Sequence, residues 1–169
     1  NGGSRKTFLE KAAEIEGIYV PGFYRVTYKE DGTIADFTPV NPHARPVIRK
    51  QMEKDLTNTY YPQAPVVPFI KVTQDRIVLE IQRGCIRGCR FCQAGMLYRP
   101  TRERDVETLK QYAFQMLKST GHEEISLSSL SSSDYSQLKE LVTFLIQEFK
   151  GEGINISLPS LRIDAFSLD

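Results

Sequence analysis

The organisation of this chain is decided by Arg83-Gly84-Cys85-Ile86-Arg87-Gly88-Cys89-Arg90-Phe91-Cys92, a stretch that holds all three cysteines of the 169 residues. The cysteines follow the spacing C-x3-C-x2-C, so they lie within one short loop. Cysteine thiolates are ligands for soft metal centres, and three of them in one loop indicate that the loop binds a metal.

Two kinds of metal centre are compatible with three cysteines. A structural zinc site takes four protein ligands, and the two candidates for the fourth, His43 and His122, each stand alone in the sequence. A four-iron cluster is normally held by four thiolates, so three thiolates leave one iron open to another ligand. An open iron suits a catalyst, which favours a cluster over a non-catalytic zinc-binding module.

The cysteine spacing, with Phe91 just before the last cysteine, resembles the signature C-x3-C-x-aromatic-C of the radical S-adenosylmethionine (SAM) superfamily. The resemblance implies that Cys85, Cys89 and Cys92 hold a [4Fe-4S] cluster and that Phe91 packs near the adenine of SAM. In that superfamily SAM binds the open iron, and one electron from the cluster cleaves it to a 5′-deoxyadenosyl radical.

The longer run from Glu80 to Pro100 resembles the uncharacterised branch of this superfamily that carries a cobalamin-binding-type domain ahead of the radical domain. This resemblance covers roughly residues 60–169 and implies cobalamin as a further cofactor of the full-length protein. A methylthiotransferase-like enzyme that modifies RNA or protein would share the cluster chemistry, so it remains an alternative. The sequence names no substrate.

Residues 69–169 alternate strand and helix patterns. Strands are predicted at 76–81, 123–130 and 154–158, with helices at 105–119 and 135–150 between them. Asp105 is expected to cap the first helix, and Ser133 or Asp134 the second. The order predicts an α/β fold with right-handed crossovers and a parallel sheet. It resembles the first half of the partial (βα)6 TIM-like barrel of radical SAM enzymes, truncated at its C-terminus.

Residues 1–68 precede that region and have weaker patterns. They predict a short helix at 5–16 capped by Ser4, and a hairpin of strands at 23–28 and 33–38. A proline-rich wrapping segment follows at 39–68, with at most a short helix near 47–56. We therefore expect two parts, an N-terminal connecting region at 1–68 and the barrel region at 69–169.

Three loops are expected to meet at one edge of the sheet, because ligands of parallel α/β sheets bind at the carboxyl ends of the strands. They are the cysteine loop, the serine-rich residues 127–135 and the segment 159–164. Ser129 and Ser131 stand where the superfamily has the Gly-Gly-Glu motif that holds the amino group of SAM. Ser160 could meet a ribose hydroxyl, and Arg162 either the SAM carboxylate or a structural ion-pair partner.

Arginines are dense around the cysteines in a chain that is otherwise balanced, with 22 basic and 21 acidic residues. They could stabilise an anionic cluster, offer a basic rim to an electron donor such as flavodoxin or ferredoxin, or simply face solvent. The six are Arg83, Arg87, Arg90, Arg99, Arg102 and Arg104. The overall balance gives no indication of nucleic-acid binding.

The sequence also bears on the compartment. No apolar run approaches the roughly 18 residues that span a bilayer, and the N-terminus lacks the apolar core of a signal peptide. Three cysteines crowded into one loop argue against a disulfide framework. We expect a cytoplasmic protein without membrane partners, and a chain that begins at Asn1 without methionine is expected to be a piece of a longer one.

Overall fold

A computed structural model of the chain describes residues 3–165 and divides into two compact units, Asn1–Met52 and Glu53–Asp169. Residues 53–68, which we expected to belong with the N-terminal region, therefore group with the sheet-containing unit. The domain boundaries of the whole protein stay a prediction. None of the helices in the described residues is long and apolar enough to cross a membrane.

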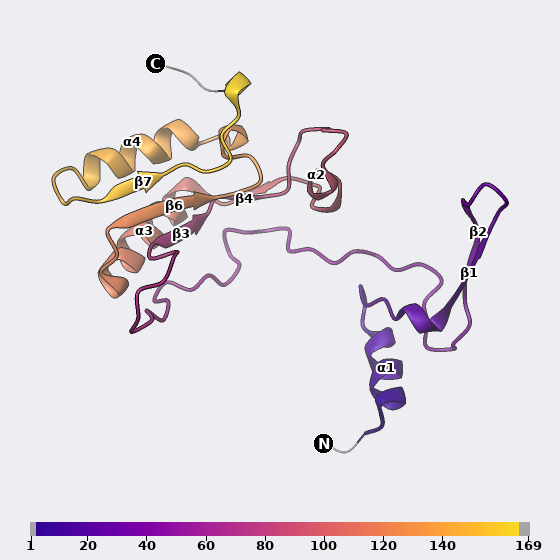
Figure 1. The fold of residues 1–169 in the computed structure, drawn as a ribbon. Coiled ribbons are helices and arrows are strands. Elements are labelled where there is room, and N and C mark those ends of the chain that lie inside the picture. Colours follow the sequence, from indigo (N-terminus) through magenta and orange to yellow (C-terminus); the bar gives the residue numbers. More distant parts are fainter. Residues whose placement is uncertain (1–2, 166–169) are drawn as a thin grey trace. The chain divides into compact units, whose positions relative to one another are not determined.

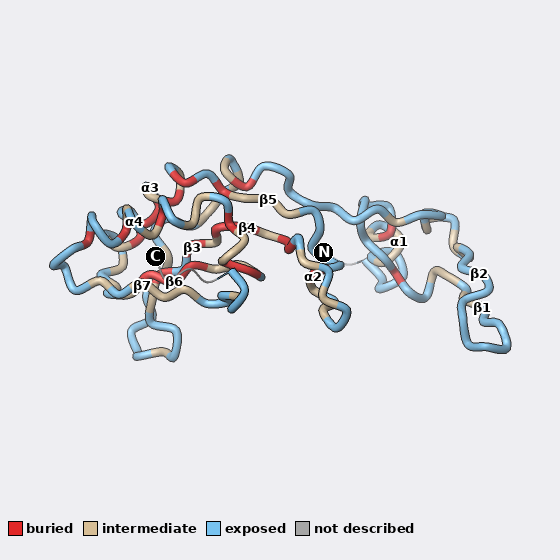
Figure 2. The backbone as a smooth tube through the Cα atoms, turned by 90° about the horizontal axis from the view of Figure 1, so that it is seen from above, coloured by how far each residue is buried: buried red, intermediate tan, exposed pale blue. Residues whose placement is uncertain are grey.

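The first unit contains the predicted helix and hairpin. α1 spans Arg5–Glu14, two residues shorter than expected, and Ser4 caps it by accepting a hydrogen bond from the Thr7 amide at 3.2 Å. A 3-10 turn, Pro21–Phe23, leads into β1 (Tyr24–Tyr28) and β2 (Ile34–Pro39), which pair antiparallel. Few residues of this unit are buried, as the pale tube of Figure 2 shows.

The second unit is built on a parallel sheet in the order β3-β6-β7 (Figure 1). α3 connects β3 to β6 and α4 connects β6 to β7, which confirms the predicted α/β arrangement and its similarity to part of a βα barrel. These five elements are β3 (Ile77–Glu80), α3 (Val106–Thr120), β6 (Glu124–Ser128), α4 (Leu138–Glu148) and β7 (Asn155–Ser157).

Several short elements were not predicted. β4 (Gln82–Arg83) and β5 (Arg102–Glu103) form a two-residue antiparallel ladder, and α2 (Gln93–Leu97) starts at the last cysteine. Two 3-10 turns, Ser132–Asp134 and Ile163–Ala165, follow β6 and β7. The optional helix near 47–56 does not form, and the Asp55 side chain instead accepts amide hydrogen bonds that make a local turn.

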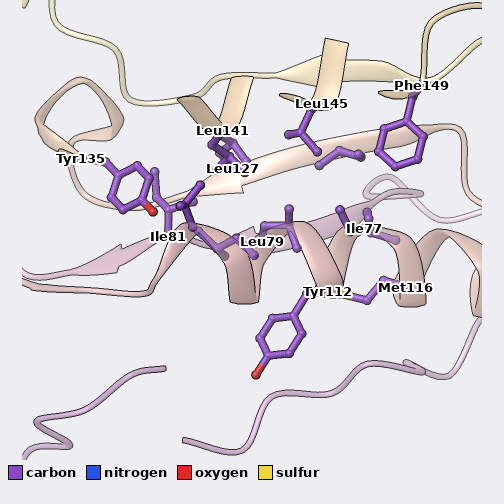
Figure 3. Packing of buried hydrophobic residues seen from close by; sticks show 14 residues of the cluster. Ile77, Leu79, Ile81, Tyr112, Met116, Leu127, Tyr135, Leu141, Leu145 and Phe149 are labelled. Carbon is purple, nitrogen blue, oxygen red and sulfur yellow. The ribbon is translucent and has the colours of Figure 1, made fainter. Parts of the chain in front are cut away.

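The core lies between the sheet and its two crossover helices (Figure 3). Ile77 and Leu79 of β3 are buried, while Val78 between them is 39% exposed, as the period of two in a strand requires. The helices contribute buried residues at helical spacing, and removing each large apolar side chain from water is worth roughly 2 kcal/mol. They are Leu109, Ala113 and Met116 of α3, and Leu141 and Leu145 of α4.

The N-terminus of α4 differs from expectation. The helix begins at Leu138 with Gln137 in the cap position, and no side chain caps it. Both predicted caps have other partners, because Ser133 Oγ accepts a hydrogen bond from the Arg162 amide and the Asp134 carboxylate binds Arg87. The predicted cap of α3 is confirmed, with Asp105 accepting from the Thr108 amide at 3.1 Å.

The outer edge of β3 is closed by the side chain of Tyr61. Its hydroxyl donates to the carbonyl of Val78 at 2.6 Å and accepts from the amide of Glu80 at 3.1 Å, two groups that face away from β6. Burial raises the pKa of this hydroxyl, so it stays protonated and able to donate. The Tyr61 ring stacks on Tyr112 of α3 at a centroid distance of 5.3 Å.

Arg104 completes this contact and anchors the segment that carries Tyr61. It is fully buried, and its guanidinium lies over the rings of Tyr61 and Tyr112, 4.8 and 5.5 Å from their centroids. It donates to the carbonyl of Glu80 at 3.2 Å and to the carbonyl of Leu56. These contacts explain why residues 53–68 group with the second unit, and none of the three roles expected for the arginines around the cysteines included such burial of Arg104.

Replacing Tyr61 by phenylalanine keeps the stacked ring but removes the hydroxyl from two backbone groups of β3. We expect Tyr61→Phe to lower the free energy of unfolding by about 1–2 kcal/mol, because both groups lose their partner. Tyr60→Phe is the matched control, since Tyr60 is 87% exposed. Urea denaturation followed by circular dichroism measures both, and equal effects of the two variants would contradict the assigned contact.

Candidate cofactor site

The cysteine loop leaves the sheet after β3 and β4 and ends at Cys92, which caps α2. Cys85 is buried, whereas Cys89 and Cys92 are partly exposed. Two of the sulfurs accept backbone hydrogen bonds, Cys85 from the Arg87 amide at 3.4 Å and Cys92 from the Gly95 amide at 3.3 Å. Amide donors of this kind stabilise thiolates, and they raise the reduction potential of a cluster that those thiolates hold.

The donor set of this loop fits an iron–sulfur cluster by its chemistry, since it offers three thiols and amide donors to two of them. Within residues 3–165, however, no three His, Cys, Asp or Glu side chains are grouped so that they could hold a metal ion.

Each histidine lies beside a carboxylate of its own unit. His43 belongs to the first unit, where its Nδ1 lies 2.7 Å from Oε1 of Glu14. His122 precedes β6, at the end of the sheet opposite the cysteine loop, and its Nδ1 lies 3.3 Å from Oδ1 of Asp75.

The loops after β6 and β7 meet as predicted. The Ser132 amide donates to the carbonyl of Ser160 at 3.2 Å, and Ser160 holds a left-handed backbone with φ 61. Ser131 is buried and its Oγ donates to Asp134 at 2.8 Å, while Ser129 Oγ lies 3.0 Å from that of Ser132. The hydroxyls of Ser129 and Ser131 thus lie where the loops after β6 and β7 meet, and both already interact with other protein side chains.

Arg162 and Phe91 are the remaining residues that were expected to contact SAM. Arg162 donates to the Asp164 carboxylate through Nε and Nη2, at 3.0 and 2.8 Å, so the structural ion pair forms. The pKa of Arg162 is raised mainly by Asp164 and to a lesser extent by the Cys89 thiol, which places its guanidinium beside the cysteine loop. Phe91 is 92% exposed on the loop surface.

Five of the six arginines near the cysteines bind groups of the chain itself. Arg83 pairs with Glu80 through two hydrogen bonds, and the side chains of Arg99 and Arg102 donate to backbone carbonyls. Arg104 is buried as described, and Arg87 binds Asp134. Arg90 is exposed and makes no hydrogen bond or ion pair within the described part of the chain.

Sequence reasoning missed one buried polar residue at this edge. Gln82 is 2% exposed and its Nε2 donates to the carbonyl of Ser131 at 2.7 Å, which links the start of the cysteine loop to the loop after β6. Its Oε1 has no hydrogen-bond partner among residues 3–165. A polar residue directly after the buried Ile81 was the available signal.

Gly84 and Gly88 offer a matched test of the loop conformation. Gly84 has φ 89, and a Cβ there would lie 2.5 Å from the carbonyl oxygen of Tyr98, whereas a Cβ on Gly88 meets only the Arg99 side chain at 4.0 Å. We expect Gly84→Ala to lower the free energy of unfolding by about 2 kcal/mol or more. Gly88→Ala should change it by less than about 1 kcal/mol. Thermal denaturation compares them, and the reverse order would refute this loop geometry.

Comparison with known proteins agrees with the cysteine motif. Residues 79–168, more than half of the chain, match the family model of the radical SAM superfamily. Uncharacterized protein MJ0966 of Methanocaldococcus jannaschii is 33% identical over 132 residues, which cover 73% of this chain and 29% of that protein. Putative methylthiotransferase MJ0865 of the same organism is 27% identical over 150 residues, covering 82% and 30% respectively.

The chain spans less than a third of the length of these curated relatives. The matches do not show the cobalamin-binding branch that the longer cysteine-containing run resembles. The family model does cover the end of β3, the cysteine loop, β6, β7 and the loops that follow them. The chain therefore belongs to the radical SAM superfamily.

Proposed function

We propose that the protein containing this chain is a radical SAM enzyme in which Cys85, Cys89 and Cys92 hold a [4Fe-4S] cluster. The observation that carries the proposal is the position of the cysteine loop at the sheet edge where the loops after β6 and β7 also meet. A cofactor bound by the cysteines would lie beside the hydroxyls and the arginine on those loops. A cluster held there would supply one electron to bound SAM, whose sulfonium C–S bond would break to give methionine and a 5′-deoxyadenosyl radical.

The residues around the cysteines have distinct roles in this proposal. The amides of Arg87 and Gly95 hydrogen-bond the sulfurs and offset part of their negative charge. Ser160 is exposed and offers its hydroxyl to the polar groups of SAM, while Ser129 and Ser131 would do so by sharing or leaving their partners Ser132 and Asp134. The exposed ring of Phe91 is available to the adenine of SAM. Arg90, exposed on the same loop, provides a positive charge for an acidic electron donor such as flavodoxin or ferredoxin.

A methylthiotransferase-like reaction on RNA or protein is the second candidate. The observation that favours it is the match to a relative named as a putative methylthiotransferase. Such a reaction would leave a methylthio group on the substrate. Mass spectrometry of RNA and protein digests from a deletion strain and its parent would detect this, and identical digests would exclude the candidate.

Substituting the cysteines tests the cluster. We expect anaerobic reconstitution of the whole protein with iron and sulfide to give a reduced four-iron electron paramagnetic resonance signal that changes when SAM is added. Cys85→Ser, Cys89→Ser and Cys92→Ser should each lose most of the iron, because three thiolates are the minimum set. Metal analysis of the purified protein provides the control, and a protein that takes up only zinc would refute the proposal.

Arg162 and Asp164 separate a SAM contact from a structural ion pair. Both variants Arg162→Gln and Asp164→Asn break the pair between these side chains. If Arg162 binds the SAM carboxylate, Arg162→Gln should weaken SAM binding by about tenfold or more, since a charge-assisted contact is lost. Asp164→Asn frees the guanidinium and should not weaken binding. Isothermal titration with SAM measures both, and equal losses would leave Arg162 a purely structural role.

A further inference from the structure

An ion pair joins the cysteine loop to the turn after β6. Arg87, which lies between the first two cysteines, donates from Nε to both carboxylate oxygens of Asp134, at 2.9 and 3.2 Å, and also from Nη2. The Asp134 side chain is only 5% exposed and receives a further hydrogen bond from Ser131 Oγ at 2.8 Å. Multiple charge-assisted bonds of this kind fix orientation as well as distance.

The backbone of Arg87 also makes hydrogen bonds on both sides. Its amide donates to the sulfur of Cys85 at 3.4 Å, and its carbonyl accepts from Nη2 of Arg99 at 3.0 Å. A single residue therefore contacts one predicted cluster ligand, the segment after α2 and the turn that follows β6. Displacing the Arg87 side chain would release the loop from that turn at a point adjacent to the ligand.

We propose that Arg87 and Asp134 are positioning residues, whose ion pair holds residues 84–92 against the turn after β6 so that the cysteines keep a fixed place relative to Ser131. This inference rests on the proposed function. The pair also has an electrostatic consequence, because each side chain neutralises the other beside Cys85. Loss of Arg87 leaves a buried carboxylate unpaired there, and loss of Asp134 leaves an unpaired guanidinium.

The positioning role and the electrostatic effect of the pair can be measured separately in two variants, as loop opening and as cluster midpoint potential. Arg87→Gln and Asp134→Asn both break the ion pair, so both should loosen the loop. Reduction adds negative charge to a cluster, and an unpaired negative group nearby opposes it while a positive group favours it. Arg87→Gln should therefore lower the midpoint potential of the cluster, and Asp134→Asn should raise it. A purely structural role would not produce shifts of opposite sign.

Hydrogen–deuterium exchange of the whole protein without cofactors tests the positioning role. We expect peptides covering residues 84–92 to exchange about tenfold faster in Arg87→Gln and in Asp134→Asn, because the local opening becomes easier. The double variant should exchange no faster than either single one, since the pair is already broken. Arg87→Lys, which keeps the charge but loses the forked geometry, should fall between wild type and Arg87→Gln.

Arg90→Gln is the matched control, because it removes the same charge from the same loop at an exposed residue. Its exchange should equal that of the wild type, and wild-type exchange in either pair variant would overturn the proposal.

Redox titration followed by electron paramagnetic resonance then measures the midpoint potentials, and shifts of the same sign in both pair variants would also overturn it. If the wild type forms no cluster, the proposed function fails, while the exchange result still decides whether the pair holds the loop.

Discussion

Parallel pairing of β3 with β6, and of β6 with β7, is the constraint on which the rest of this unit depends. Glu80 at the end of β3 lies opposite Ser128 at the end of β6, and Ser126 lies opposite Ser157 at the end of β7. The strands therefore finish at one edge, and three segments far apart in sequence leave the sheet side by side. The hydrogen bond from Gln82 to Ser131 and the one from Ser132 to Ser160 both follow from this arrangement.

Electrostatic pairing then gives that edge its fixed geometry. The pairs Arg87–Asp134 and Arg162–Asp164 lie on different loops, yet the pKa of Asp134 is lowered first by Arg87 and also by Arg162. Some of the charges that look like a basic surface in the sequence are thus balanced within the fold. Arg83 and Arg87 pair with carboxylates, so the net positive charge around the cysteines is smaller than the count of arginines suggests, while Arg90 and Arg99 remain exposed.

Long periodic elements were predictable because their own pattern specifies them. α3 and β3 have apolar residues at the spacing of a helix and a strand, and the caps Ser4 and Asp105 hydrogen-bond within the first turn. β4 and β5 have two residues each, too few for any period to show. Asp134 has a capping position in the sequence, but its partner is 47 residues away, and only the folded sheet brings the two together.

Some features of the candidate site could likewise be predicted from the sequence, while others depend on the fold. The cysteine motif identifies the loop without any structure, because ligand type and spacing are local properties. Burial of Arg104 was not predictable, since it is a charged residue whose partners come from distant segments, and the partner of Gln82 is 49 residues away in the sequence. The expected roles of Ser129, Ser131, Ser160 and Arg162 remain predictions, although the structure brings them to one edge of the sheet.

Tyr61 and Arg104 also determine at which edge of the sheet a further strand can pair. An unpaired strand edge invites another strand to add, but the outward amide and carbonyls of β3 are occupied by a phenolic hydroxyl and a guanidinium. A strand from elsewhere in the protein, or from a second molecule, cannot pair there without displacing both side chains. Extension of the sheet is thereby directed to the β7 side, and the same two side chains protect β3 from edge-to-edge aggregation.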